Sequence, residues 1–223
     1  MTRIAARFGA AGTWGFQTKL GSVVTRDRAA ADELVTLTAR IAAILEAREL
    51  LRPRTAGIHN WLTFKGESWP NETYATIALR DAASIVPEVT AVLDARERAR
   101  KFRAFGQLLV RGDGTALDVL GQSHAYRDLL VLEAYTLDCH HVELSTSSDI
   151  WMTQSFRAEP QPEIAARNAP RLREAFEAIE SELHLEFYDL GVTHFATTRL
   201  YELVPHDSAV DERYLEPDEP SHR

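Results

Sequence analysis

Segments with apolar residues at helical spacing alternate with short runs of β-branched and aromatic residues, and this mixed order constrains the fold most. The helical segments cover residues 25–52, 87–105 and 168–183. Runs typical of strands cover residues 16–24, 58–65, 73–79, 107–111, 115–120, 129–137, 140–146, 150–156 and 193–204. Helices and strands in this order predict a single-domain α+β fold, in which a mainly antiparallel sheet of about six to eight strands carries about three helices, mostly on one face.

Turn and cap residues indicate where these elements begin and end. Thr25 is the predicted N-cap of the first helix, and Pro53 is its predicted stop. Gly112-Asp113-Gly114 lies between two apolar runs and predicts a β-hairpin, so the flanking strands should be antiparallel. Asn168 is the predicted N-cap of the last helix, with Pro170 in its first turn.

The charge of the chain divides it into two parts. The formal net charge is −8, from 33 acidic and 25 basic residues. Residues 206–223 carry a net charge of −4, which leaves −4 for residues 1–205. We therefore expect one domain over 1–205 and an acidic, mobile tail over 206–223. The acidic balance argues against a nucleic-acid partner.

Cysteine usage and hydropathy favour a soluble, cytoplasmic protein. Cys139 is the one cysteine in the sequence, so an internal disulfide is excluded. Apolar runs are too short for a membrane span, and the N-terminus lacks the apolar core of a secretory signal. The phosphate-binding loop GxxxxGK[ST] and the Rossmann glycine spacing are both missing from the sequence. We therefore expect no membrane association and no cofactor.

Gly121-Gln122-Ser123-His124-Ala125 comes within one residue of the GxSxG nucleophile elbow of hydrolases. In a small hydrolase, Ser123 would be the nucleophile, His194 the base and Asp149 the residue that orients the base. The strand before Gly121 belongs to a predicted hairpin, however, whereas the elbow of such enzymes follows a parallel strand. The favoured interpretation is therefore a polar loop without a catalytic residue.

A second cluster of reactive side chains surrounds Cys139. If the chain is extended there, Cys139, His141 and Glu143 lie on one face of a strand and form a possible zinc ligand set for a metal-dependent enzyme. A zinc deaminase is excluded because its PCxxC motif needs two cysteines. The alternative to a metal site is a histidine pair in a strand, with one ring in the core and one in solvent, and this alternative is preferred.

The second predicted helix has a basic C-terminal end. Arg96, Arg100 and Arg103 share one of its faces and are candidate anion contacts. Cations near a helix C-terminus also complement the helix dipole on a solvated face, and this structural interpretation is favoured.

Because motifs that identify a reaction are missing, the leading hypothesis is a non-enzymatic protein-binding module. Its expected partner is another protein, and this partner is basic if the chain is an immunity-type protein that neutralises a basic toxin or effector. The alternative is an enzyme, either a small hydrolase with Ser123, Asp149 and His194 or a metal-dependent enzyme with Cys139, His141 and Glu143. The sequence leaves the oligomeric state open.

Overall fold

The computed structural model of the protein describes residues 3–6, 10–19, 27–64, 67–99, 105–193, 195–206, 209–210 and 215–218. Its helices are α1 (Arg28–Ala47), α2 (Ile85–Arg98) and α3 (Pro162–Leu183), and the 3-10 turn η1 (Ala82–Ser84) leads into α2. The strands are β1 (Arg3–Ala6), β2 (Gly12–Gln17), β3 (Arg52–Phe64), β4 (Glu67–Ala78), β5 (Phe105–Leu117), β6 (Ser123–Arg127), β7 (Val131–Thr136), β8 (His140–Thr146), β9 (Glu186–Asp189), β10 (Ala196–Arg199), β11 (Glu202–Pro205) and β12 (Leu215–Asp218).

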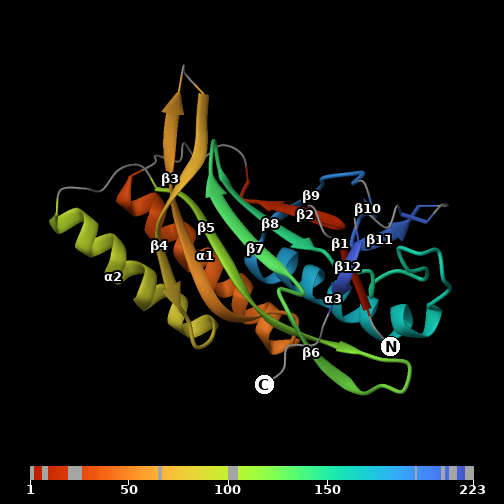
Figure 1. Ribbon diagram of the computed structural model, residues 1–223. Coiled ribbons are helices and arrows are strands. Elements are labelled where there is room, and N and C mark those ends of the chain that lie inside the picture. Colours follow the sequence, from red (N-terminus) through yellow and green to blue (C-terminus); the bar gives the residue numbers. More distant parts are fainter. Residues whose placement is uncertain are drawn as a thin grey trace.

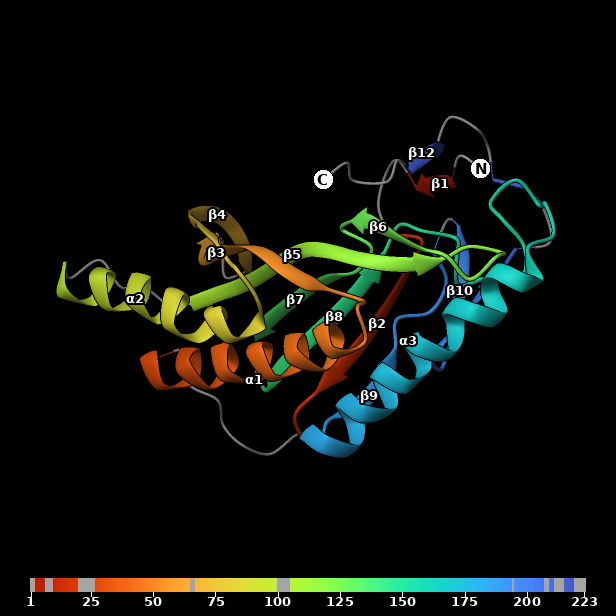
Figure 2. The ribbon, with the colours of Figure 1, turned by 90° about the horizontal axis from the view of Figure 1, so that it is seen from below.

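The central feature is an antiparallel sheet of eight strands (Figure 1). Seven of them follow the order β4-β3-β5-β7-β8-β2-β9, and β6 pairs with β5 beside this path. The long β3–β4 hairpin forms one edge of the sheet and β9 forms the other. The helices lie on one side of the sheet (Figure 2), so the predicted α+β fold with helices mostly on one face is confirmed. Two smaller antiparallel pairs, β1 with β12 and β10 with β11, complete the described strands.

Alternating burial along the central strands explains why the helices cover only one face. Along β7 and β8 every second side chain is buried, among them Leu132, Ala134, Val142 and Leu144. These side chains face the helices, while the residues between them lie on the face away from the helices and are half-buried. Alternation of this kind is the pattern expected for an antiparallel sheet with one packed face.

The core beneath β2 is built from aromatic rings of β2 and α3. Trp14, Phe16 and Phe176 are fully buried. The ring of Phe176 lies edge-on to Trp14 at 5.1 Å and to Phe16 at 5.5 Å between ring centroids. Such edge-to-face pairs stabilise a core by about 0.5–1.5 kcal/mol beyond the area they bury. This contact holds α3 against the β2 side of the sheet.

The predicted hairpin at Gly112–Gly114 is wrong, because β5 runs straight through these residues. The two glycines do not form a turn. They allow the neighbouring backbone to lie close to β5. A Cβ atom at Gly112 would lie 1.9 Å from the carbonyl oxygen of Arg52, and one at Gly114 would lie 2.4 Å from that of Leu50. A side chain at either position would therefore clash with the chain that enters β3.

Helix boundaries also differ from the prediction. Helix α1 is capped by Asp27, whose carboxylate accepts a hydrogen bond from the Ala30 N–H at 3.1 Å, and it ends at Ala47. Pro53 is therefore not the helix stop but a residue of β3. Helix α3 begins at Pro162, so Asn168 is not its cap. Thr25, the predicted cap of α1, lies outside the described residues.

Several predicted strands are shifted or replaced. The first strand is β2, Gly12–Gln17, and residues 20–24 of the predicted strand lie outside the described part of the chain. Residues 150–156 form turns with buried side chains instead of a strand. The predicted strand over 193–204 is the short hairpin β10–β11. Within the acidic tail, Leu215–Asp218 forms β12, and the mobility of the rest of 206–223 stays a prediction. None of the helices in the described residues is both long and apolar enough to cross a membrane.

Candidate functional site at the acidic end of the sheet

Several segments that are distant in the sequence meet at one end of the sheet. His141, in β8, lies opposite Gln17 of β2, and Gln17 lies opposite Glu186 of β9. The turn between β7 and β8 therefore lies beside the end of β2 and the beginning of β9. In Figure 2 the N-terminal end of α1 and the C-terminal end of α3 lie toward this same side of the molecule.

Side-chain contacts join the helices to this end. The Nε2 atom of His140 lies 3.4 Å from Oε2 of Glu33 in α1. From the middle of α1, the Arg40 guanidinium donates a hydrogen bond of 3.4 Å to the carbonyl oxygen of Glu182, near the C-terminus of α3. Helix α1 thus contacts the start of β8 through Glu33 and the C-terminal end of α3 through Arg40.

Carboxylates are concentrated here, and we call this surface the acidic end. It is defined by the acidic residues that contact, or interact electrostatically with, Arg28, Arg40 or the residues of the β7–β8 turn and the start of β8, which are Asp32, Glu33, Asp94, Glu97, Asp138, Glu182 and Glu186. The guanidinium of Arg28 lies among three of these carboxylates, at 2.9 Å from Asp32, 2.7 Å from Asp94 and 3.2 Å from Glu97. One positive charge therefore faces three negative charges. The side chains of Glu33 and Asp138 are 72% and 69% exposed, so their charges face solvent.

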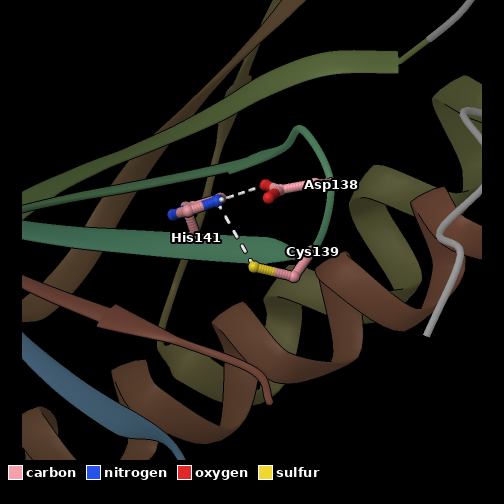
Figure 3. A group of neighbouring side chains, drawn as sticks. All are labelled: Asp138, Cys139 and His141. Carbon is pink, nitrogen blue, oxygen red and sulfur yellow. Dashed lines mark hydrogen bonds and ion pairs between the residues drawn. The ribbon is translucent and has the colours of Figure 1, made fainter. Parts of the chain in front are cut away.

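Asp138, Cys139 and His141 form a compact group within the acidic end (Figure 3). The Nε2 atom of His141 lies 3.3 Å from the Cys139 sulfur and 3.2 Å from Oδ1 of Asp138. One donor atom from each residue lies within 4.8 Å of the others. Because Asp138 and Cys139 belong to the turn before β8 and His141 belongs to the strand, the turn folds the first two side chains toward the imidazole.

The imidazole of His141 is held from several sides. It stacks on the ring of Tyr135 across the β7–β8 pair, with 5.3 Å between centroids and 9° between the planes. Its Nδ1 atom lies 3.4 Å from the hydroxyl of Tyr188 in β9. The Tyr188 ring lies over Gly15, where a Cβ atom would come within 2.3 Å of it. The ring of His141 therefore has a fixed orientation, with Nε2 directed at the turn.

Burial and nearby charge shift the pKa values of the groups around His141. Burial raises the pKa of the Cys139 thiol, and the carboxylates of Asp138 and Glu186 raise it further. The hydrogen bond with His141 lowers the pKa of the Asp138 carboxyl. Burial, with the Glu143 carboxylate beside it, raises the pKa of the Tyr135 phenol. Burial is thus the main cause of the raised values, and the neighbouring carboxylates add to it.

His140 points to the opposite face of β8 and has a different environment. It is almost fully buried, and its Nδ1 atom lies 2.9 Å from the hydroxyl of Thr136. Burial lowers the pKa of His140, and this effect outweighs the attraction of Glu33 for its charged form. The prediction placed one ring of the pair in the core and the other in solvent. His140 lies in the core, whereas the side chain of His141 is only 14% exposed.

The compact group contains two of the three metal ligands predicted from the sequence. Glu143 shares a face of β8 with His141, but its carboxylate accepts a hydrogen bond of 2.5 Å from the Tyr135 hydroxyl. Asp138 instead completes the group of donor atoms. Strand alternation does not extend into the turn before β8, so the sequence pattern points to Glu143 instead of Asp138. The acidic residue directly before Cys139 is the sequence signal for the third donor.

The predicted hydrolase residues are distributed over separate elements. Ser123 is exposed and begins β6, which pairs with β5 in a hairpin. Asp149 is buried after β8, and its carboxylate accepts a hydrogen bond of 3.1 Å from the Phe156 N–H. His194 lies outside the described residues. The strand–turn–strand around Gly121 differs from the strand–turn–helix of a nucleophile elbow, and the catalytic role of these residues stays a prediction.

The predicted anion contacts are only partly described. Arg96 is half-buried on α2, while Arg100 and Arg103 lie outside the described residues. Their role stays a prediction.

A basic grouping that the sequence analysis missed lies where β3 begins and β5 pairs with β6. There Arg54 donates to Asp113 at 2.5 Å and Arg111 donates to Asp128 at 3.1 Å. Together with Arg127, these residues line a groove of about 470 Å³. Because β3 follows the C-terminus of α1, this groove lies at the other end of α1 from the acidic end. Because Asp113 and Asp128 line the same groove as the three arginines, its lining carries a net charge of only +1.

Comparison with known proteins found no matching family model, no matching curated protein and no matching solved structure.

Proposed function

We propose that this protein is a non-enzymatic protein-binding module whose acidic end captures a basic partner. This is the action of an immunity-type protein that neutralises a basic toxin or effector, and we propose that it takes place in the cytoplasm. One observation carries the proposal: carboxylates from α1, α2, the β7–β8 turn, α3 and β9 gather at one end of the fold. Surfaces of one charge sign accelerate encounter with partners of the opposite sign.

The position of Arg28 supports this proposal. Its side chain is only 19% exposed and is already bound to Asp32, Asp94 and Glu97. The other described cations of these segments are Lys19, Arg40, Arg96 and Arg98, so the seven carboxylates of the acidic end exceed the five cations by two. The groove at the other end of α1 has a net charge of +1 and therefore does not attract a basic partner. Such a partner approaches the acidic end preferentially.

An apolar contact is available beside the acidic residues. Leu137, in the β7–β8 turn, is 41% exposed and directly precedes Asp138. Charged rims mainly set the association rate and the specificity, whereas buried apolar residues contribute most to the lifetime of a complex. A basic protein with a shallow apolar site among its cations is therefore the partner that fits this end. A nucleic acid does not fit, because its phosphates would face carboxylates.

The experiment measures association of the full chain with the product of each neighbouring gene that encodes a basic protein. We expect the association rate constant to fall by about tenfold or more as salt rises from about 0.01 to about 0.15 M, because the screening length falls from about 30 to about 8 Å. An association rate independent of salt, or the lack of binding at micromolar concentrations, would contradict the proposal.

Helix α3 offers a matched pair of variants. Glu182 and Glu163 are both exposed and lie near opposite ends of this helix, about 28 Å apart at 1.5 Å per residue. Glu182→Lys and Glu163→Lys change the net charge equally, but only Glu182 belongs to the acidic end. We expect Glu182→Lys to slow association several-fold more than Glu163→Lys. Equal slowing by the two variants would show that net charge acts without a defined acidic surface, and the proposed docking site would be wrong.

A further inference from the structure

The donor atoms of Asp138, Cys139 and His141 are spaced as the ligands of one metal ion are spaced. The distances from His141 Nε2 are 3.3 Å to the Cys139 sulfur and 3.2 Å to Asp138 Oδ1. Ligand bonds of 2.0–2.3 Å around a tetrahedral zinc ion place neighbouring donor atoms roughly 3.3–3.8 Å apart. The third separation, between the Cys139 sulfur and an Asp138 carboxylate oxygen, is at most 4.8 Å. The exposed Asp138 side chain therefore needs to move by at most about 1 Å for the three residues to share an ion.

In the protein without a metal ion, two hydrogens can link this group. A hydrogen on His141 Nε2 points toward only one of its two neighbours, the Asp138 carboxylate or the Cys139 sulfur. The hydrogen of the Cys139 thiol is a weak donor and serves one further contact. A cation placed between the three donors attracts all of them at once.

The surroundings of His141 match those of a metal-bound histidine. When Nε2 binds a metal, Nδ1 carries the hydrogen and needs an acceptor, and the Tyr188 hydroxyl lies 3.4 Å from it. The stacked ring of Tyr135 fixes the plane of the imidazole. An outer partner and a fixed ring of this kind orient a ligand before the metal arrives, and they commonly raise metal affinity 10–100-fold.

Burial divides the group into a closed side and an open side. Cys139 is fully buried, His141 is half-buried and Asp138 is exposed. An ion held by these residues would thus have protein on three sides and solvent on the fourth. Sites with three protein ligands and one open position bind water or an incoming ligand there.

We propose that Asp138, Cys139 and His141 bind one divalent cation of the zinc class, with a fourth coordination position open to solvent. Thiolate and imidazole donors select zinc over magnesium or calcium, which prefer oxygen ligands. The site stands independently of the partner-binding proposal, because it needs no second protein. The thiol must lose its proton to bind the ion, so binding releases a proton and strengthens as pH rises.

The test uses the full chain after treatment with a chelator. Zn²⁺ is titrated in competition with a chromophoric chelator, and Co²⁺ is titrated as a spectroscopic probe. We expect binding of one ion per chain and an ultraviolet charge-transfer band of a Co²⁺–thiolate bond. Cys139→Ser should remove this band, and Asp138→Asn should lower Zn²⁺ affinity by about tenfold or more.

Two control variants separate ligation from general charge. Glu33→Gln removes one charge from the acidic end, as Asp138→Asn does, and the two side chains are similarly exposed. We expect Glu33→Gln to keep Zn²⁺ affinity within a factor of about three, since Glu33 contacts His140 and not the group. Glu143→Gln tests the alternative ligand set with Cys139 and His141, and it should also retain the affinity.

Three results would overturn the proposal. One is the lack of Zn²⁺ binding by the unmodified chain at micromolar concentrations. Another is equal loss of affinity in Asp138→Asn and Glu33→Gln, which would indicate attraction by the general negative field. The third is loss of affinity in Glu143→Gln while Asp138→Asn binds normally. Asp138 is exposed, so its variant should fold, and circular dichroism verifies this before the titration.

Discussion

Asn168 of α3 and Leu117 of β5 exchange two hydrogen bonds across the interface between helix and sheet. The Leu117 N–H donates to Oδ1 of Asn168 at 2.9 Å, and Nδ2 of Asn168 donates to the Leu117 carbonyl at 2.8 Å. The same Nδ2 also donates to the Ile164 carbonyl one turn earlier in the helix, at 2.9 Å. Asn168 is fully buried. This single side chain therefore ties the N-terminal half of α3 to the end of β5.

We expect Asn168→Ala to lower the free energy of unfolding by about 2–3 kcal/mol, because each buried hydrogen bond contributes about 1 kcal/mol. The substitution also removes the side-chain partner of backbone groups at Leu117 and Ile164, away from water. Urea denaturation measures the change. Arg167→Ala serves as the control, since Arg167 is the preceding residue and donates a hydrogen bond of 3.2 Å to Val119 from an exposed position. Its loss should cost less than about 1 kcal/mol. Equal effects would contradict a special role for Asn168.

Gly112 is expected to be intolerant of any side chain. A Cβ atom there would lie 1.9 Å from the Arg52 carbonyl oxygen and 3.0 Å from Cα of Pro53, so backbone must move. We expect Gly112→Ala to destabilise the protein by about 3 kcal/mol, at the upper end of the usual cost of overpacking. Thermal unfolding followed by circular dichroism provides the measurement.

Gly57→Ala is the matched control for Gly112→Ala. Gly57 also lies in a paired strand of the same sheet, but its nearest neighbour would be the side chain of His59 at 3.2 Å. A side chain can turn away more easily than backbone, so the cost should stay below about 1 kcal/mol. If both variants unfold at the same temperature, close backbone approach does not explain why Gly112 is a glycine.

The sequence predicted the central strands well because their packing is one-sided. In β7 and β8 the alternation of apolar and polar residues reports directly which face is buried, and the observed bounds lie within a few residues of those expected. The Gly112–Gly114 segment failed for a different reason. Glycine is equally compatible with a turn and with close approach of two backbones, and only the position of the α1–β3 connection decides between them.

Short or polar elements were not predictable from local pattern. Strand β9 consists of Glu186–Asp189, with two acidic residues among four, and it is defined by its pairing with β2. The start of α3 was misplaced because Asn168 and Pro170 resemble a helix N-terminus, whereas Pro162 occupies the actual first position. In these cases tertiary contacts outweigh local preference.

The candidate site was only partly visible in the sequence. Cys139 and His141 were found because they are neighbours in the chain, and neighbouring ligands need no knowledge of the fold. The rest of the acidic end depends on the meeting of distant segments. Glu33 and Glu186 approach the β7–β8 turn only because α1 and β9 flank β2 and β8 in space. Spacing along the chain carries no information on such proximity.

Asp118 is expected to hold together the turn between β5 and β6. Its carboxylate accepts hydrogen bonds from the N–H groups of Leu120 at 2.8 Å and Gln122 at 2.9 Å, and it lies 2.9 Å from Nε2 of His124. Asp118→Ala should raise the amide hydrogen-exchange rates of Leu120 and Gln122 by about tenfold, because these groups become open to solvent.

The variant Asp118→Asn provides the comparison, since its amide oxygen still accepts hydrogen bonds. We expect its exchange rates to lie between those of the unmodified protein and those of Asp118→Ala. Amides in β7 and β8 should be unaffected by either change. Faster exchange across the whole sheet would show global destabilisation instead of loosening of one turn.

His140 should make stability depend on pH in a defined direction. Burial lowers the pKa of His140 below its ordinary value of 6.5, so the unfolded chain binds a proton that the folded chain resists. The neutral form therefore stabilises the fold fully above the unfolded-state pKa of 6.5. This contribution is lost as pH falls below 6.5 toward the lowered pKa of the folded protein. One such group changes the free energy of unfolding by at most about 1.4 kcal/mol per pH unit.

His140→Gln removes this titration while keeping a polar side chain near Thr136 and Glu33. The free energy of unfolding is measured by urea denaturation between about pH 8 and about pH 5. It should fall more over this range for the unmodified protein than for the variant. Glu133 has the opposite effect on the pH dependence of stability. Burial and the nearby Glu143 raise the pKa of its carboxyl, so its protonation at low pH stabilises the fold. Since Glu133 and Glu143 are present in both proteins, the difference between the two pH profiles isolates His140. Parallel profiles would show that the pKa of His140 is the same in the folded and unfolded protein, which would contradict the prediction.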